Sequence, residues 1–301
     1  MKKCSGGVED LNKKVKIKNI LINSVKVIGN IIIAMIIIIL AQFVSGAVGG
    51  LLPSVWLYDM ISTIFYIAIT LGIGLLYAKY VLHFKPEELG VRRRLPELRW
   101  IIIGLALPIL VSAIYLFFIN GQLVRNDRLS AVSSTIIYAI FVAGIGAGIV
   151  EEFIFRGIIM RMTERCFGKI VSVFLLSLLF GVAHLMFVDL SAWNRMDIIL
   201  VSIGGTLVGI MFSLIAYQSK TIWSSAVVHG IWNSIMIGGI LEIGSVSYGM
   251  SVNSIWYYKI ASHNIFLTGG RFGIEVAMPA VLGYTIVSII TIIFLKKKRL
   301  I

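Results

Sequence analysis

The stretch that decides the fold runs from Ser133 to Met160 and reads SSTIIYAIFVAGIGAGIVEEFIFRGIIM. It is apolar for longer than a bilayer requires, since a transmembrane helix needs about 20 apolar residues. Within it stand Glu151, Glu152 and Arg156. Ionisable side chains at membrane depth cost about 2.5–3.5 kcal/mol each on insertion scales. We therefore interpret the stretch as a membrane helix whose charged residues have either a function or a firm structural partner.

Seven further apolar segments flank this stretch on both sides. The whole chain of 301 residues is 58% hydrophobic and only 14% charged, whereas soluble domains carry about 25% charged residues. The predicted fold class is therefore all-α, a polytopic membrane bundle of about eight transmembrane helices. It forms one domain over 27–295, with a motif-bearing core at about 133–240. The eight predicted spans are 27–51, 55–78, 100–119, 133–160, 170–188, 197–217, 221–242 and 275–295.

The basic residues predict the orientation of the bundle, because cytoplasmic loops are enriched in Lys and Arg. Of the 27 Lys and Arg residues, 21 fall in segments that the eight spans place on the same side of the membrane as the N-terminus. Five fall in loops on the other side, and one, Arg156, lies in a span. We expect cytoplasmic termini, with a basic segment at 1–26 and a basic tail at 296–301. The net charge of +13 then meets the anionic inner leaflet, and no nucleic-acid partner is needed to explain it. The predicted location is the plasma membrane of a bacterium, as a multi-pass integral protein.

The charged residues of the fourth span have a helical spacing that pairs two of them. Glu152 and Arg156 stand four residues apart and can form an ion pair on one helix face. Glu151 lies about 100° around the helix and is left without that local partner. A carboxylate in a poorly solvated place suits a general base. Alternatively, both glutamates belong to a structural ion network, and the two interpretations are equally open at this point.

Two further motifs place imidazoles in apolar spans. The fifth span contains Phe180-x-x-x-His184, and the seventh contains His229-x-x-x-Asn233, whose two polar side chains project from one helix face. A lone intramembrane histidine is more often a hydrogen-bonded structural residue, and amides and imidazoles also bridge membrane helices for packing alone. Each motif is therefore weak by itself.

Together, the three motifs indicate a chemistry. In a bundle they can converge on one cavity that holds a base, imidazoles and a hydrogen-bond donor. Amide hydrolysis needs a group that deprotonates water and donors that stabilise the tetrahedral oxyanion. The expected depths agree only in part, because His184 lies further from the inner end of its span than Glu151 and His229 do.

The ordered set Glu151-Glu152-x-x-x-Arg156, Phe180-x-x-x-His184 and His229-x-x-x-Asn233 resembles that of the CPBP family. These are the CAAX proteases and bacteriocin-processing enzymes also called Abi proteins. The resemblance implies an eight-helix bundle with a cavity inside the membrane. It also implies roles: Glu151 activates water with help from His184, and His229 and Asn233 form the oxyanion site. Glu152 and Arg156 would support them.

The sequence leaves the use of a metal open. Glu151, His184 and His229 would be the ligands if a divalent ion such as Zn is used, since catalytic zinc takes three protein ligands and a water. However, no His-Glu-x-x-His motif occurs, and a His/Asn pair suits hydrogen bonding. No firm cofactor is predicted, and the metal-free mechanism is slightly favoured.

The leading hypothesis for function is an intramembrane endopeptidase. Its partner would be a membrane-associated peptide or protein substrate, in peptide or bacteriocin processing or in self-immunity. The alternative is a non-proteolytic binding, immunity or scaffold protein that uses the same cavity. A transporter is a third hypothesis, because intramembrane acids and histidines also mark proton relays, but transporters often show repeats and broken helices, and neither is visible in this sequence.

Overall fold

A computed structural model describes residues 5–91, 95–127, 132–187, 194–245 and 254–297. The chain is predominantly helical, and the predicted all-α bundle is confirmed as its fold class. The helices are α1 (Ser5–Gly49), α2 (Val55–Tyr80), α3 (Leu98–Phe118), α4 (Val132–Ile137), α5 (Ala147–Glu152), α6 (Met160–Phe167), α7 (Lys169–Ala183), α8 (Arg195–Ser219), α9 (Ile222–Met236), α10 (Ile265–Thr268) and α11 (Met278–Lys297).

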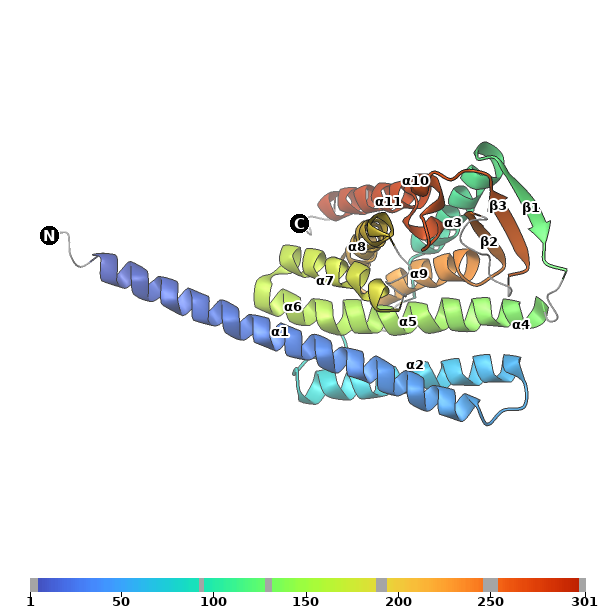
Figure 1. The fold of residues 1–301 in the computed structure, drawn as a ribbon. Helices are drawn as coiled ribbons and strands as arrows, with labels where there is room; N and C mark the ends of the chain where they lie inside the picture. The colour runs from blue at the N-terminus through green and yellow to red at the C-terminus, as the bar shows by residue number, and fades with distance from the viewer. Residues whose placement is uncertain (1–4, 92–94, 128–131, 188–193, 246–253, 298–301) are drawn as a thin grey trace.

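Every predicted span contains a helix, but not all of these helices are long enough to cross a bilayer. In the described part of the chain, six are long and apolar enough, and α7 and α9, with 15 residues each, are shorter. The six are Val15–Gly49, Val55–Tyr80, Leu98–Phe118, Val132–Phe167, Arg195–Ser219 and Met278–Lys297. The start of α1 and the end of α11 lie on the same side of the bundle (Figure 1). Their cytoplasmic location stays a prediction, and residues 1–4 and 298–301 of the basic ends lie outside the described part.

The fourth span is one long helical segment, Val132–Phe167, in which two π-helical segments interrupt the α-helix. The α-helical turns of α5 stand between two π-helical segments, Tyr138–Gly146 and Phe153–Ile159. A π-helix is rare and is frequently found at functional sites. Glu151 and Glu152 are the last two residues of α5, so the carboxylate pair stands directly before the second π-helical segment.

A small sheet at the end of the bundle is absent from the sequence-based prediction. Strands β1 (Gly121–Arg125), β2 (Leu241–Ser245) and β3 (Trp256–Ile260) form it in the order β1-β3-β2. β3 pairs antiparallel with β1 and parallel with β2. The predicted span 221–242 was therefore too long: α9 ends at Met236, and Gly239, with φ of 79°, turns the chain into β2. The sheet lies at the end opposite the termini (Figure 1).

The bounds of the first and last spans also differ from prediction. α1 begins at Ser5 and runs for 45 residues, so residues 5–26 of the predicted basic segment are helical and continuous with the first span. α1 projects from the bundle beyond the other helices (Figure 1). At the other end of the chain, α11 begins at Met278, and Glu275 stands before it in a 3₁₀ turn, Ile274–Val276. Glu275 is thus outside the last membrane span.

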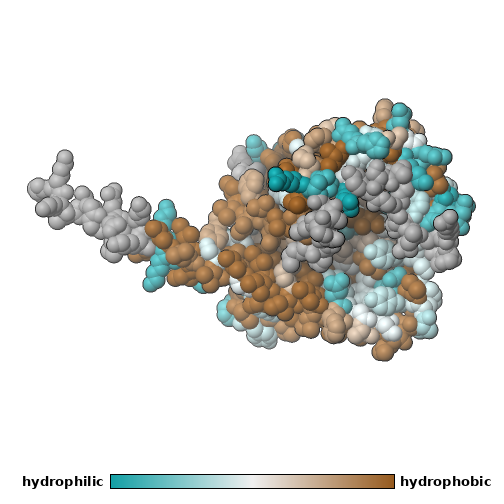
Figure 2. Space-filling model, in the orientation of Figure 1, coloured by the Kyte–Doolittle hydropathy of each residue, from teal (hydrophilic) through white to brown (hydrophobic). Residues whose placement is uncertain are grey.

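Glycines allow the functional helices to pack closely. A Cβ atom on Gly148 of α5 would lie 2.8 Å from the backbone oxygen of Ala226 and 3.0 Å from Gly230 on α9. Similarly, a Cβ atom on Gly205 of α8 would lie 2.6 Å from Gly181 of α7. Small residues at such crossings are typical of membrane helices, which associate by close packing. Large apolar side chains cover the outside of the helices, and hydrophilic residues gather near the sheet (Figure 2).

Candidate active site

Glu152 and Arg156 form a fully buried ion pair, as their spacing predicted. Arg156 Nη1 donates to Glu152 Oε1 over 2.8 Å, and both side chains have 0% exposure. Arg156 Nη2 donates to the carbonyl oxygen of Gly209 on α8 over 3.2 Å. A buried charge is tolerated only when it is paired and hydrogen-bonded. The pair therefore ties the fourth span to α8 and fixes the orientation of the carboxylate.

Aromatic rings enclose the Arg156 guanidinium. Its carbon lies 4.5 Å from the ring centre of Phe180 and 5.3 Å from that of Phe212, which is the range of a cation–π contact. Phe180, the first residue of the second motif, thus has a structural task in covering the charge. Phe212 and Gly209 were not identified from the sequence, because neither has a polar side chain to mark it.

His229 on α9 lies between the two glutamates. Its Nδ1 atom is 3.0 Å from Glu152 Oε1, and its Nε2 atom is 3.9 Å from Glu151 Oε2. The ring stacks on Phe212, with centroids 4.6 Å apart and planes 17° apart. Since an ionised carboxylate can only accept, Nδ1 donates to Glu152. In the neutral ring, Nε2 is then an acceptor; in the doubly protonated ring, Nε2–H is a second donor.

His184 stands at the end of α7, as the first residue of the 3₁₀ turn His184–Phe187. Its Nδ1 atom lies 2.7 Å from the carbonyl oxygen of Phe180, which can only accept. The proton is therefore on Nδ1, and Nε2 is the acceptor when the ring is neutral. The predicted span 170–188 ends as a helix at Ala183. Although α7 ends before His184, this side chain still lines the same cavity as Glu151 and His229. The difference in depth expected from the sequence therefore does not keep these residues apart.

One cavity of about 270 Å³ brings four of the six predicted site residues together. Glu151, His184, His229 and Asn233 line it, whereas Glu152 and Arg156 lie behind its wall. About a third of the Glu151 side chain is exposed, at 32%, in contrast to 0% for Glu152. The structure thus separates the adjacent glutamates into one that faces the cavity and one that is locked in the ion pair.

The cavity also holds residues that the sequence analysis missed. Glu275, Phe272 and Tyr284 come from the segment before α11 and from α11 itself, and Trp232 stands between His229 and Asn233 on α9. Glu275 was assigned to the boundary of the last apolar span, where an acidic residue is unremarkable. Only the packing of the segment 272–276 over the cavity reveals it.

The side chains proposed as metal ligands were tested against this geometry. Within the described ranges, no group of three or more His, Cys, Asp or Glu residues is arranged to hold a metal ion. Glu151, His184 and His229 share the cavity, and His229 and His184 each use Nδ1 in a hydrogen bond inside the protein, which leaves only Nε2 of each ring to face the cavity. The residues present do not form a ligand set in this arrangement.

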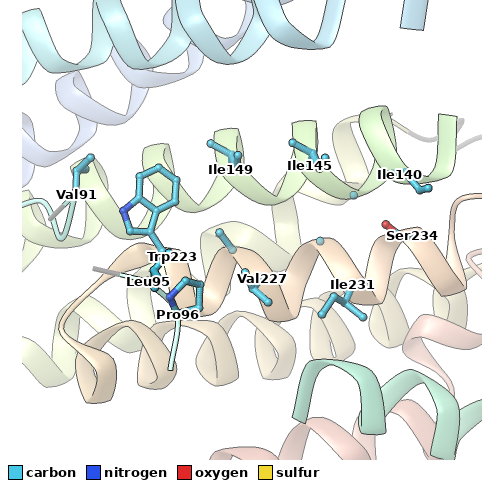
Figure 3. A pocket seen from close by; sticks show the side chains of 13 residues that line it. Val91, Leu95, Pro96, Ile140, Ile145, Ile149, Trp223, Val227, Ile231 and Ser234 are labelled. Carbon is cyan, nitrogen blue, oxygen red and sulfur yellow. The ribbon is translucent and has the colours of Figure 1, made fainter. Parts of the chain in front are cut away.

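A second, larger pocket of about 800 Å³ lies between the fourth span and α9. Ile140, Ile145 and Ile149 line one side, and Val227 and Ile231 line the other, with Ser234 at one end (Figure 3). The pocket contains no charged residue among those that the structure describes. It can hold hydrocarbon, but it has no group for acid–base or nucleophilic chemistry. The smaller cavity is therefore the candidate active site.

A comparison with protein families agrees with the motifs that converge there. Residues 133–235 match the family described as type II CAAX prenyl endopeptidase Rce1-like. The segment is Rce1-like. It includes the fourth span, α7, α8 and nearly all of α9, and so all six predicted site residues. The resemblance to CAAX proteases is thereby confirmed over these residues. No curated protein and no solved structure matches the chain.

The Rce1-like match and the apolar helices agree on the class of protein. The match supports a protease, and the six helices of spanning length support an integral, multi-pass membrane protein. Glu275, Phe272 and Tyr284 lie outside the matched residues. The Rce1-like segment therefore supplies the motif residues of the cavity, while part of its wall comes from the C-terminal portion of the chain.

Proposed function

We propose that this protein is an intramembrane endopeptidase that hydrolyses a peptide bond in a membrane-associated peptide or protein. The observation that carries the proposal is the convergence of Glu151, His184, His229 and Asn233 on one cavity. The Rce1-like match over 133–235 supports the same reaction class. A carboxylate, two imidazoles and an amide are sufficient for amide hydrolysis without a covalent intermediate.

Glu151 is the general base in this mechanism. Its carboxylate is the partly exposed one, so it can accept a proton from a water molecule in the cavity. The water oxygen attacks the carbonyl carbon, and the proton passes from Glu151 to the departing amine nitrogen. The Nε2 acceptor of His184 can hold the attacking water in place, because its Nδ1 already donates to Phe180.

His229 and Asn233 stabilise the tetrahedral oxyanion. Asn233 offers amide N–H donors, and in the described part of the chain its side chain is not engaged in another hydrogen bond. His229 contributes Nε2–H in the doubly protonated form, since Nδ1–H is held by Glu152. Glu152 and Arg156 position that ring and balance its charge, which is an indirect role. One oxyanion donor is typically worth about 10²–10³ in kcat.

The proposed biological context is the processing of membrane-associated peptides, including bacteriocin-like precursors, or self-immunity against them. Such substrates would reach the cavity from the lipid or from the membrane surface. The non-proteolytic alternative uses the same cavity to hold a peptide without cutting it. It requires no general base, and Glu151 therefore separates the two hypotheses.

The test compares membrane peptides from cells that express the wild type, Glu151→Gln or Glu87→Gln at equal levels, by terminal-labelling mass spectrometry. Glu87 is an exposed glutamate on the loop after α2 and is the matched control for loss of one carboxylate. New termini with the wild type and Glu87→Gln, but not with Glu151→Gln, are expected. If Glu151→Gln produces the same termini, Glu151 is not the base; if a conferred immunity survives in Glu151→Gln, the binding hypothesis replaces proteolysis.

A further inference from the structure

Glu275 contributes a second carboxylate to the lining of the candidate active site. It stands in the 3₁₀ turn before α11, 40 residues beyond the end of the Rce1-like match at residue 235. Its position is well defined by its neighbours. The Trp232 indole lines the same cavity and favours the ionised form of its carboxyl group, and the Tyr284 hydroxyl donates to its backbone oxygen over 3.1 Å. The rings of Trp232 and Tyr284 also contact each other, with centroids 5.1 Å apart.

The charge balance of the cavity is negative when both glutamates are ionised. Its lining contains Glu151 and Glu275, and no Lys or Arg among the described lining residues. The nearby cation Arg156 lies behind the wall and is already paired with Glu152. The charge of Glu151 acts on Glu275 and opposes its ionisation, and burial acts in the same direction. A cationic group that enters the cavity would stabilise the ionised form of Glu275 and so offset both effects.

Aromatic side chains complete the surroundings that suit a cation. Phe180, Phe212, Trp232, Phe272 and Tyr284 all line the cavity. Aromatic faces attract ammonium and guanidinium groups, especially where water is excluded. A purely structural role for Glu275 is the simplest alternative, because one hydrogen bond from a neighbouring donor would satisfy its carboxyl group. That role needs only an acceptor oxygen, however, and a neutral glutamine side chain would provide one.

We infer that Glu275 is a specificity residue of the proposed protease, which selects substrates with a Lys or Arg side chain beside the scissile bond. The inference rests on the proposed function, because it concerns the substrate of the same cavity. Glu151 remains the group that acts on water. Glu275, which lies in the C-terminal part of the chain, binds the cationic side chain of the substrate. The aromatic rings of the cavity surround that side chain.

The experiment uses the full chain in nanodiscs and peptides with an N-terminal palmitoyl anchor. Sets of dodecapeptides differ at one position, which is Lys, Gln or Glu, and this position is moved along the peptide. The wild type is expected to cleave the best Lys peptide about tenfold or more faster than its Gln counterpart, because the charged side chain forms a charge-assisted hydrogen bond with Glu275. The difference should appear mainly in KM.

Three variants make the result specific to the charge of Glu275. Glu275→Gln keeps the size of the side chain and an acceptor oxygen, and it should cut the Lys and Gln peptides at similar rates. Glu275→Asp keeps the charge and should retain a preference for Lys, and the distant Glu87→Gln should behave as wild type. A wild type without charge preference, or a Glu275→Gln variant that keeps the full preference, overturns the inference while leaving proteolysis standing.

Binding of the same peptides separates this inference from the proposed function. If no peptide is cleaved, fluorescence anisotropy of labelled peptides reports whether the chain binds the Lys series more tightly than the Gln series. Binding that depends on charge and on Glu275 would support the selectivity and count against proteolysis. Equal binding of the Lys, Gln and Glu series would overturn the selectivity as well.

Discussion

The Nδ1 atom of His229 lies 3.0 Å from the Oε1 atom of Glu152, although 77 residues separate them in the chain. The same oxygen accepts a hydrogen bond from Arg156. This shared acceptor links the first and third motifs into one buried unit with three charged or ionisable members. The unit determines which nitrogen of His229 faces the cavity, and so which chemistry that ring can perform.

Removing one charge from this unit should destabilise the protein strongly. We expect Arg156→Met to lower the free energy of unfolding by about 3–5 kcal/mol, because it leaves a buried carboxylate without its cation. Thermal unfolding of the purified protein in detergent measures the loss. The double variant Glu152→Leu/Arg156→Met should recover much of the stability but no activity, since His229 loses its acceptor. Equal unfolding temperatures for wild type and Arg156→Met would refute the structural role of the pair.

Substitution of Gly148 should inactivate the protein through helix packing. A Cβ atom there would lie 2.8 Å from the backbone oxygen of Ala226, so Gly148→Ala must push α5 and α9 apart and lengthen the contact between Glu152 and His229. Peptide cleavage should fall by at least about tenfold, in line with the cost of small misplacements at catalytic groups. Gly72→Ala is the control, because a Cβ atom on Gly72 has no neighbour within 4 Å. Equal activity of the two variants would show that this crossing does not position the site.

Stability should depend on pH through Glu275. Burial raises the pKa of Glu275 to about 7, from an ordinary value of 4.5, against the opposing influence of Trp232. A carboxyl group whose pKa is higher in the folded state stabilises fully below its unfolded pKa, and this contribution is lost as pH rises through the folded value. The unfolding temperature of the wild type should therefore decrease between pH 5 and pH 8 relative to that of Glu275→Gln. Parallel pH profiles for the two proteins would contradict this prediction.

The cavity should be accessible from the side that the distribution of basic residues assigns to the outside. Ile237 lines it from the connection between α9 and β2, and Phe272 and Glu275 line it from the connection between α10 and α11. In a Cys4→Ser/Cys166→Ser background, Ala261→Cys should react with a membrane-impermeant thiol reagent in intact cells. Glu87→Cys, on an exposed loop at the other end, should react only after permeabilisation. The reverse labelling pattern would mean that the protein is inserted the other way.

The motifs predicted the polar part of the site because intramembrane charges are costly and therefore conspicuous. The pairing of Glu152 with Arg156 could be predicted from helical spacing alone, without tertiary information, and the structure confirms it. The hydrogen bond from His229 to Glu152 could not be predicted, since it depends on how α5 and α9 cross at Gly148 and Gly230.

The remaining differences from prediction have local physical causes. The sheet was missed because its strands are only five residues long, and the apolar residues Ile240 and Leu241 continue the pattern of the preceding helix into β2. The length of α1 was missed because hydropathy marks where a chain enters lipid, whereas a helix can continue through water. Glu275 was missed because a single acid at the edge of a span carries no periodicity.

The length of α1 has a mechanical consequence. Its 45 residues correspond to a rod of about 68 Å at 1.5 Å per residue, more than twice the thickness of about 30 Å of the hydrocarbon core. Lys16, Lys18 and Lys26 therefore lie on a continuous helix and not on an irregular segment, and they are spread over about 15 Å of its axis. A partner that binds the N-terminal end of α1 would act at a distance from the bundle, and a rotation of this helix would be transmitted to α2, against which α1 packs.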